Sequence, residues 1–234
     1  MRVALFGGSF DPVHKGHVLS ALELVDKLGL QQLQFIPCGK HAFSKAHYFS
    51  SEQRVAMLQL AIKEFSSLGI DTRETDREAV SYSIDTCREI RAELGVAAQI
   101  FFVIGSDLLA GLHRWHNWEL LLDYVNIVVM QRAGQTVYSA NNIQTLNTDV
   151  QRLLQKAQNK SAEDTAKASR GEFITLELSP WPLSSTQVRQ TLNALASAPA
   201  AKRVTLTQAL ADMLDPAVYE YIIKNDLAGS QISR

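Results

Sequence analysis

The residues of this chain whose types and spacing best suit chemistry on a phosphate are His14 and His17. They follow the pair Gly7-Gly8, where an apolar segment ends and a helix is expected to begin. Residues three apart share one face of a helix, so the two imidazoles can converge on one ligand. The unused N–H groups of a helix start attract anions. This segment therefore predicts a phosphate-binding site.

A strand, a turn and a helix must position the two histidines. The run from Val3 to Phe6 is apolar throughout, which is typical of a strand covered on both faces of a parallel sheet. The glycine pair allows a sharp turn and a close approach to a ligand. Pro12 disfavours an earlier helix, so we expect the helix to begin near Lys15 and to end at Gly29. The alternative is that the histidines only cap and pack this helix start.

Strand-like and helix-like segments alternate along the chain. Further strands are expected at Leu33–Pro37, near Ile70–Thr72, at Gln99–Ile104 and at Asn126–Met130. A helix after Ser50 could begin with a capping box to Gln53, and another is expected from about Ile84 to Leu94, ended by Gly95. The alternation predicts an α/β fold with a doubly wound parallel sheet. Ligands of such sheets bind beyond the carboxyl ends of the strands.

Length, composition and charge set limits on the function. The chain has 234 residues and a formal charge of −1, so it lacks the global basic field of many nucleic-acid-binding proteins. Cys38 and Cys87 fit neither a metal-binding spacing nor a disulfide framework. The first apolar run is too short for a signal peptide, and no segment approaches a membrane span. We expect a cytoplasmic protein that binds neither nucleic acid nor membranes, and a homo-oligomer is compatible with the sequence.

One domain is expected over 1–234. Residues 1–134 would form the nucleotide-binding core. The polar segment 135–170 would form an exposed loop and a surface helix, and 171–234 would hold the last strand and C-terminal helices.

A second segment with chemical potential is 183–189, Leu-Ser-Ser-Thr-Gln-Val-Arg. Hydroxyl residues that follow prolines make good N-caps, so the segment by itself predicts a well-capped helix. The functional alternative is a second phosphate site. Hydroxyls and free N–H groups at the helix start would hold phosphate oxygens, with Arg189 one turn away as a fork-shaped donor.

These two segments resemble known signatures. The sequence His14-Lys15-Gly16-His17, after Gly-Gly-Ser-Phe-Asp-Pro, is similar to the His-x-Gly-His element of the nucleotidylyltransferase superfamily. Segment 183–189 resembles its second signature, with Leu183 where isoleucine is usual. Members of this superfamily move a nucleoside monophosphate from a nucleoside triphosphate onto a phosphate acceptor. The resemblance implies a Rossmann-like nucleotidylyltransferase fold with a small C-terminal helical part.

The likeness extends over nearly the whole chain to the pyridine-nucleotide adenylyltransferases, and most closely to their bacterial nicotinate-nucleotide branch. The segments that carry it are Ser81–Thr86, Ile104–Asp107, Leu112–Trp115, Pro180–Pro182 and Pro216–Ile223. It implies that ATP and nicotinate mononucleotide are the substrates. It also implies Mg²⁺ bound through the ATP phosphates, with no metal ligands supplied by side chains.

The resemblance implies roles for the matched residues. Catalysis would depend on His14, His17, Lys45 and Arg189. ATP and its phosphates would be bound by Gly7, Gly8, Ser9, Phe10, Lys40, Ser184, Ser185 and Thr186. The ribose and mononucleotide would be bound by Asp107, Gly105, Tyr82, Thr86 and Trp115.

Several of these residues have simpler interpretations. Asp107 could merely cap the next helix. Trp115 and Trp118 could both belong to the core, since aromatic residues dominate packing; we favour Trp115 as the stacking partner of the pyridine and Trp118 as core. The segment 39–47 lacks the proline pair usual in the family, although its basic residues remain. It could be an ordinary solvated basic loop.

The charges suggest the mechanism. A phosphate monoester is mostly doubly ionised at pH 7, so the acceptor needs no general base. Positioning and electrostatic stabilisation would then supply most of the catalysis. A protonated imidazole would help more than a neutral one, and a bound polyphosphate raises the pKa of histidine. The alternatives are relaxed specificity for the amide mononucleotide, a sibling transferase that acts on phosphopantetheine or uses CTP, and a non-catalytic nucleotide sensor.

Overall fold

The computed structural model describes residues 1–40, 47–132, 143–158 and 168–228. Its centre is a six-stranded sheet in the order β3-β2-β1-β4-β5-β6, in which every neighbouring pair is parallel. The strands are β1 (Arg2–Gly8), β2 (Gln32–Pro37), β3 (Leu68–Ile70), β4 (Gln99–Gly105), β5 (Asn126–Arg132) and β6 (Phe173–Leu178). The expected doubly wound parallel sheet is confirmed.

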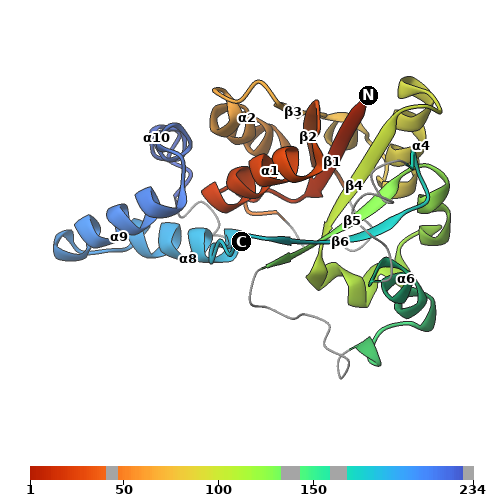
Figure 1. The fold of residues 1–234 in the computed structure, drawn as a ribbon. Helices are drawn as coiled ribbons and strands as arrows, with labels where there is room; N and C mark the ends of the chain where they lie inside the picture. Colours follow the sequence, from red (N-terminus) through yellow and green to blue (C-terminus); the bar gives the residue numbers. More distant parts are fainter. Residues whose placement is uncertain (41–46, 133–142, 159–167, 229–234) are drawn as a thin grey trace.

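Helices cover both faces of this sheet (Figure 1). Successive strand residues, such as Leu5 and Phe6 of β1, point to opposite faces and enter two separate apolar clusters. The first cluster packs against α1 (Lys15–Leu28), α2 (Ser51–Ile62) and the C-terminal helices. The second packs against α4 (Ser83–Leu94), α6 (Thr148–Gln158) and the 3₁₀ segments η1 (Ser106–Arg114) and η2 (Trp118–Asp123). The central strands β1 and β4 are therefore buried on both sides, as their apolar sequences predict.

Local signals set the helix ends that position the site. Helix α1 begins at Lys15, and Gly29 caps it in the left-handed conformation with φ 55°. Helix α2 has the expected capping box, in which Ser50 Oγ accepts from the Gln53 N–H and Gln53 Oε1 accepts from the Ser50 N–H. Helix α4 ends at Gly95 as predicted. These expectations are confirmed.

The expected third strand is displaced. It lies at Leu68–Ile70 and not at Ile70–Thr72, because Leu33 and Phe35 of β2 pair with Leu68 and Ile70. Thr72 instead precedes a short helix, α3 (Arg73–Asp76), which the sequence did not predict. The pairing of β3 with β2, which are distant in the sequence, therefore determines where β3 ends.

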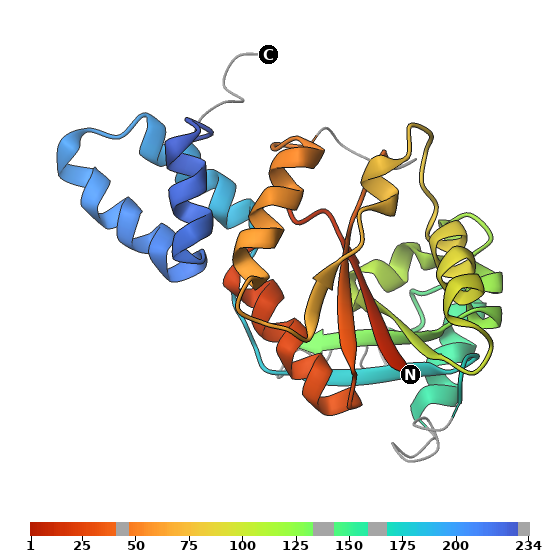
Figure 2. The ribbon, with the colours of Figure 1, turned by 90° about the horizontal axis from the view of Figure 1, so that it is seen from above.

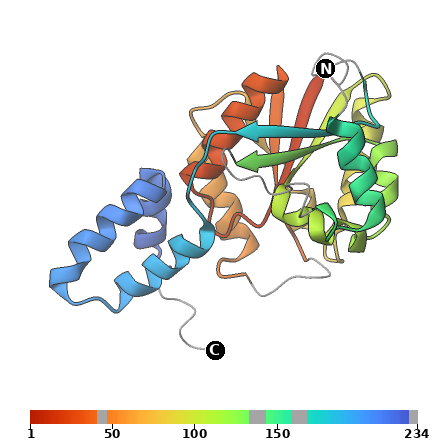
Figure 3. The ribbon, with the colours of Figure 1, turned by 60° about the horizontal axis from the view of Figure 1, so that its bottom comes forward.

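The chain leaves the sheet after β6 and continues into three C-terminal helices, α8 (Ser185–Ala196), α9 (Ala200–Met213) and α10 (Pro216–Lys224). Figure 3 shows the extended segment from β6 to α8, and Figure 2 shows α10 beside α2. Lys15 Nζ donates to the Ala211 carbonyl at 2.8 Å, which ties α1 to α9. No helix among the described residues is long and apolar enough to cross a membrane.

The polar segment 135–170 is described in two pieces, 143–158 and 168–170. Its helix, α6, buries Val150 and Leu154 against the second apolar cluster, as the expected surface helix would.

Candidate active site

A cavity of about 760 Å³ opens at the carboxyl ends of β1 and β4. A volume of this size suits a nucleotide-sized ligand. Six of the predicted site residues line it: Gly7, Gly8, Ser9, Asp107, Trp115 and Arg189. Seven polar residues that were not among the predicted site residues line it too: Asp11, Cys38, His47, Tyr48, Glu74, Ser83 and Arg114.

The two histidines form a stacked pair at the start of α1. Their ring centroids are 3.7 Å apart and their planes differ by 24°. His14 is 7% exposed, whereas His17 is half-buried and makes a T-shaped contact with Phe10, with ring centroids 5.1 Å apart. A Cβ on Gly16 would lie 3.1 Å from the His14 ring, a close contact that would push this ring by a few tenths of an ångström. Glycine between the histidines therefore leaves the His14 ring in its stacked position.

The hydrogen bond within this pair fixes the tautomer of His17. The backbone N–H of His14 donates to His17 Nδ1 at 3.2 Å. Because a backbone N–H can only donate, Nδ1 carries no proton and the ring proton of His17 is on Nε2. The expectation that a protonated ring acts on a bound polyphosphate stays a prediction. The neutral ring offers one N–H donor, at Nε2.

The predicted second phosphate segment is joined directly to the first. Arg189 Nη1 donates to the Asp11 carbonyl at 2.6 Å, and Ser185 Oγ donates to the Pro12 carbonyl at 2.9 Å. Arg189 Nη2 also donates to Thr186 Oγ1 at 3.1 Å. Ser184 caps α8, with its Oγ accepting from the Gln187 N–H. The starts of α1 and α8 are therefore held together, and the hydroxyls predicted for phosphate binding already have protein partners.

Asp11 organises the loops around this junction. Its carboxylate accepts from the N–H groups of Tyr48 and Phe49 at 2.8 and 2.9 Å, and His47 Nδ1 lies 3.8 Å away. Burial alone would raise the pKa of Asp11, but the interactions with His47 and the two N–H groups together hold it below its usual value. The side chain is thus an anionic anchor for the loop that precedes α2.

The other end of the cavity is built from the chain after β4. Gly105 ends β4, and a Cβ there would lie 2.4 Å from Asp107 Oδ1, so glycine leaves space for this carboxylate. Trp115 is half-buried against Phe102 with ring centroids 6.4 Å apart, and it lines the cavity. Trp118 is buried in the second apolar cluster, as expected.

Ten predicted site residues are not among those that line the cavity: His14, His17, Phe10, Lys40, Tyr82, Thr86, Gly105, Ser184, Ser185 and Thr186. Tyr82 precedes α4 with its ring 4.5 Å from that of His116, and Lys40 Nζ donates to the Glu78 carbonyl. Thr86 is fully buried and donates to Glu74 Oε1 at 2.8 Å. Gly105 lies one residue beyond the lining of β4. Lys45 falls outside the described residues.

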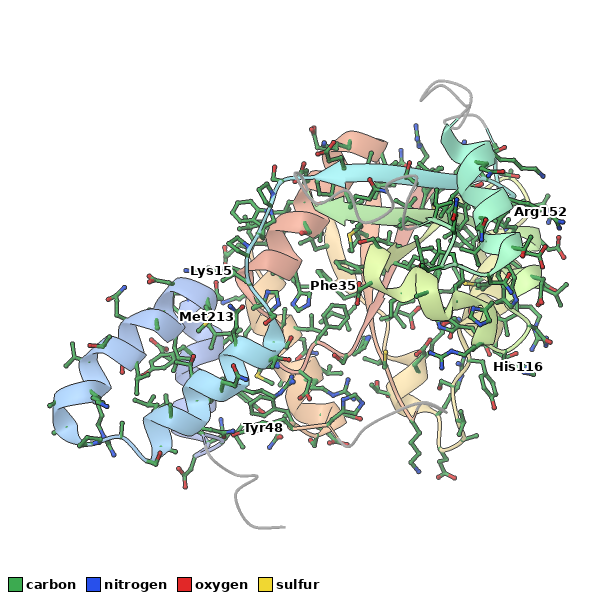
Figure 4. The ribbon with its side chains drawn as sticks, turned by 90° about the horizontal axis from the view of Figure 1, so that it is seen from below. Lys15, Phe35, Tyr48, His116, Arg152 and Met213 are labelled. Atoms are coloured by element: carbon green, nitrogen blue, oxygen red, sulfur yellow. The ribbon has the colours of Figure 1, made fainter. Side chains whose placement is uncertain are left out.

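The two ends of the site come from opposite sides of the molecule. Figure 4 shows Tyr48 beside the C-terminal helices and His116 on the far side, next to the 3₁₀ segments. Tyr48 Oη donates to Asn193 Oδ1 at 2.6 Å, which attaches the loop before α2 to α8. The cavity therefore has a phosphate end near α1 and α8 and an aromatic end near Trp115.

Comparisons with known proteins agree with this arrangement. Residues 5–191 match the cytidylyltransferase-like family. The chain is 38% identical over 193 residues to a probable nicotinate-nucleotide adenylyltransferase of Cellvibrio japonicus (strain Ueda107), covering 82% of this chain and 87% of that relative. A probable nicotinate-nucleotide adenylyltransferase of Pseudomonas putida (strain W619) is 36% identical over 191 residues, with 82% and 84% covered. The chain belongs to the nicotinate-nucleotide adenylyltransferase family.

The fold of this family member also occurs in a distant solved structure. The Plasmodium falciparum nicotinic acid mononucleotide adenylyltransferase complexed with NaAD superimposes with a TM-score of 0.66 at 16% identity, over 97% of each chain. At 16% identity, the superposition shows only that the two proteins share a fold.

Glu74 is a cavity residue of this adenylyltransferase-family chain that sequence reasoning missed. It lies on α3, is buried, and accepts from the Thr86 hydroxyl. Burial raises the pKa of Glu74, while the hydrogen bond from Thr86 opposes that rise. The Glu74 carbonyl would lie 1.8 Å from a Cβ on Gly39, so α3 packs directly on the loop after β2. No local sequence signal marked Glu74, because its burial depends on this long-range packing.

Cys38 lines the cavity but should be unreactive. Burial, with a further contribution from Glu74, raises the pKa of its thiol to about 12. Since the thiolate is the reactive form, iodoacetamide at pH 8 should modify Cys38 at least about a hundredfold more slowly in the native protein than in urea. Mass spectrometry of timed digests measures both rates, and equal rates would show that the thiol is not shielded.

Proposed function

We propose that this protein transfers AMP from ATP to nicotinate mononucleotide, forming nicotinate adenine dinucleotide and pyrophosphate. The observation that carries the proposal is the joining of two helix starts, α1 with its histidine pair and α8 with Arg189, at one end of a cavity that ends in Trp115. Helix starts and a guanidinium suit phosphates, and a tryptophan face suits an aromatic base. Membership of the nicotinate-nucleotide adenylyltransferase family supports the same reaction.

The step is a direct in-line displacement. A phosphate oxygen of the mononucleotide attacks the α-phosphorus of ATP, a new P–O bond forms, and the bond to the β-phosphate oxygen breaks as pyrophosphate leaves. The attacking phosphate is already ionised at neutral pH, so no side chain needs to remove a proton. The protein's task is to bring two anions together and to stabilise the charge that develops on the leaving group.

The residues at the phosphate end divide this task. His17 donates from Nε2 to the α-phosphate, and His14 holds the His17 ring by stacking and by its backbone hydrogen bond. Arg189 faces the cavity and takes oxygens of the leaving pyrophosphate. The N–H groups of Ser185 and Thr186 at the start of α8 bind the same phosphates, with Lys40 and Lys45 as further cations.

Mg²⁺ fits this donor set as an ion carried by the nucleotide. The groups assigned to the triphosphate are an imidazole, a guanidinium, ammonium groups and N–H groups, all of which bind phosphate oxygens. Mg²⁺ itself prefers phosphate and water oxygens and would lower the charge of the leaving pyrophosphate. His17, Arg189 and the start of α8 would hold the phosphates that carry it.

The aromatic end suits the acidic mononucleotide. Trp115 would stack on the pyridine ring, and Asp107 would accept from ribose hydroxyls. Ser83, the first residue of the 12-residue helix α4, and Arg114 line the same cavity. The first N–H groups of a helix and a guanidinium both favour a carboxylate. Tyr82 and Thr86 would help to hold α4 in place at this end of the cavity, since Thr86 donates a hydrogen bond to Glu74.

The test of the proposed function compares the acid and amide acceptors. Pyrophosphate release is measured with Mg-ATP and either nicotinate or nicotinamide mononucleotide at matched concentrations. We expect a strong preference for the acid. Comparable rates would indicate dual specificity, and no release with either acceptor would contradict the proposed reaction.

Substituting Trp115 with alanine should raise the KM for nicotinate mononucleotide about tenfold, because stacking of a base on an aromatic side chain contributes about 1–3 kcal/mol. The KM for ATP should change by less than about twofold. Initial-rate kinetics with each substrate varied in turn measure both values. The Trp118→Phe variant, in the buried core, is the control for altered packing. An equal change in both KM values would mean that Trp115 only supports the fold.

A further inference from the structure

Two arginines of this chain have buried guanidinium groups. Arg54 of α2 has 0% of its surface exposed, and Arg91 of α4 has 5%. Burial lowers the pKa of both groups, because a charge loses hydration when it leaves water. Each guanidinium must therefore be held by strong acceptors. The acceptors of Arg54 lie at the carboxyl ends of the strands, and those of Arg91 lie at the amino ends.

Arg54 bridges the carboxyl ends of two neighbouring strands. Its Nη1 donates to the Ser9 carbonyl at 2.8 Å, and its Nη2 donates to the Cys38 carbonyl at 2.8 Å and to Ser51 Oγ at 3.1 Å. Ser9 follows β1 and Cys38 follows β2, and both line the cavity. The guanidinium thus lies behind the part of the cavity wall that these two residues form.

These hydrogen bonds fix the direction of two peptide groups. In a trans peptide the C=O and the following N–H point in opposite directions. The carbonyls of Ser9 and Cys38 point to Arg54, so the N–H groups of Phe10 and Gly39 point away from it. The chain at Phe10 has φ 45°, a left-handed conformation that is uncommon outside glycine and needs support from its surroundings. Arg54 supplies such support one residue earlier.

Arg54 also places a positive charge close to the cavity. Among the described residues, no carboxylate lies within ion-pair distance of it. The guanidinium donates to backbone carbonyl oxygens instead. A charge in a buried site is screened far less than a surface lysine. It would therefore act on a polyanion in the cavity without touching it.

We infer that Arg54 is a positioning residue for the triphosphate: it turns two peptide N–H groups toward the cavity and supplies a fixed positive charge behind the wall. The inference rests on the proposed function in that the ligand carries a triphosphate. Arg54 acts on the phosphates through the loop after β1 and the loop after β2, and has no part at the pyridine end of the site.

Arg91 provides a matched control within the same chain. Its Nε donates to the Tyr124 carbonyl at 2.7 Å, and its Nη1 donates to the Ala98 carbonyl at 2.7 Å. Ala98 precedes β4 and Tyr124 precedes β5, so these contacts lie at the amino ends of the strands, opposite the cavity. The two arginines have the same chemistry and similar burial, and only Arg54 is next to the site.

The experiment compares Arg54→Lys and Arg54→Met with Arg91→Lys and Arg91→Met. For each folded variant, Tm, kcat and both KM values are measured, and binding of the α,β-methylene analogue of ATP is measured by calorimetry. All four substitutions should lower Tm. Only the Arg54 variants should lose at least about tenfold in kcat/KM for ATP and in affinity for the analogue, with the KM for nicotinate mononucleotide changed less than about twofold. Lysine should restore part of the loss, since it keeps the charge but cannot bridge both carbonyls.

Three results would overturn the inference: equal loss in the Arg54 and Arg91 variants, equal changes in the parameters for both substrates, or wild-type affinity of Arg54→Lys and Arg54→Met for the analogue. If Arg54→Met does not fold, Arg54→Lys decides between these outcomes. The binding measurement needs no turnover, so it tests Arg54 even if the wild-type protein proves not to transfer AMP.

Discussion

Replacing His17 with alanine should lower kcat by at least about a hundredfold while the protein stays folded. In the structure His17 Nε2 carries the ring proton, because Nδ1 accepts the His14 N–H. The Nε2–H group is therefore oriented before ATP arrives and can stabilise charge at the α-phosphate as the bond to pyrophosphate breaks. Loss of one such preorganised donor typically lowers kcat by 10²–10³. Steady-state kinetics and the circular dichroism spectrum measure the effect and the fold.

The control for this variant is His113→Ala, which removes an exposed histidine of η1 that belongs to neither of the two joined helix starts. We expect near wild-type kcat for it. Wild-type turnover of His17→Ala would remove the histidine pair from the mechanism. A fall in kcat that followed only a loss of folded protein would assign His17 a packing role beside Phe10.

Replacing Arg189 with alanine should lower kcat/KM for ATP by about a hundredfold, again within the range for loss of one charge-stabilising group. Arg189 faces the cavity and also holds the Asp11 carbonyl and Thr186, so both charge and position are lost. Lysine should recover little, because a single ammonium cannot reproduce the planar fork that reaches both partners. Kinetics with ATP varied at saturating mononucleotide measure the change.

Ser185→Ala separates the two contributions of Arg189. It removes the hydrogen bond to the Pro12 carbonyl, which is the other link between α8 and the first loop, and removes no charge. We expect it to cost less than about a tenth of the Arg189→Ala effect. Equal effects of the two variants would mean that Arg189 acts by anchoring the loop alone.

The sequence was sufficient for those elements whose ends are decided locally. Gly29 ends α1 because its left-handed conformation suits glycine, and Ser50 with Gln53 begins α2 through a reciprocal pair of hydrogen bonds. The buried strands were visible as apolar runs. These signals involve residues within a few positions of each other, so they can be recognised without knowing the fold.

Other features depend on contacts between distant parts of the chain. The third strand is set by its register with β2 and ends at Ile70, which leaves Thr72 as the N-cap of α3. Glu74 and Arg54 appear in the sequence as ordinary charged helix residues, yet both are buried next to the cavity. Their environments are made by loops that the sequence does not place.

The candidate site was predictable where a motif lies on a single turn, and less so where it is shared between elements. The pairing of His14 with His17 and the position of Arg189 at the cavity follow from the two signature segments. The hydroxyls of Ser185 and Thr186, which the sequence predicts to bind phosphate, also bond to the protein, because α8 is anchored to the first loop. The spacing of residues in the sequence predicts which of them share a helix face. The packing of distant segments determines which groups that face contacts.

The most direct test of the account follows the phosphorus atoms of ATP. The protein is incubated with nicotinate mononucleotide, Mg²⁺ and ATP labelled in either the α- or the γ-phosphate, and the products are separated by chromatography. We predict that the α-label appears in the dinucleotide, that the γ-label appears in pyrophosphate, and that the two products form in equal amounts. Tight binding of ATP without either product, or release of ADP and inorganic phosphate, would contradict adenylyl transfer.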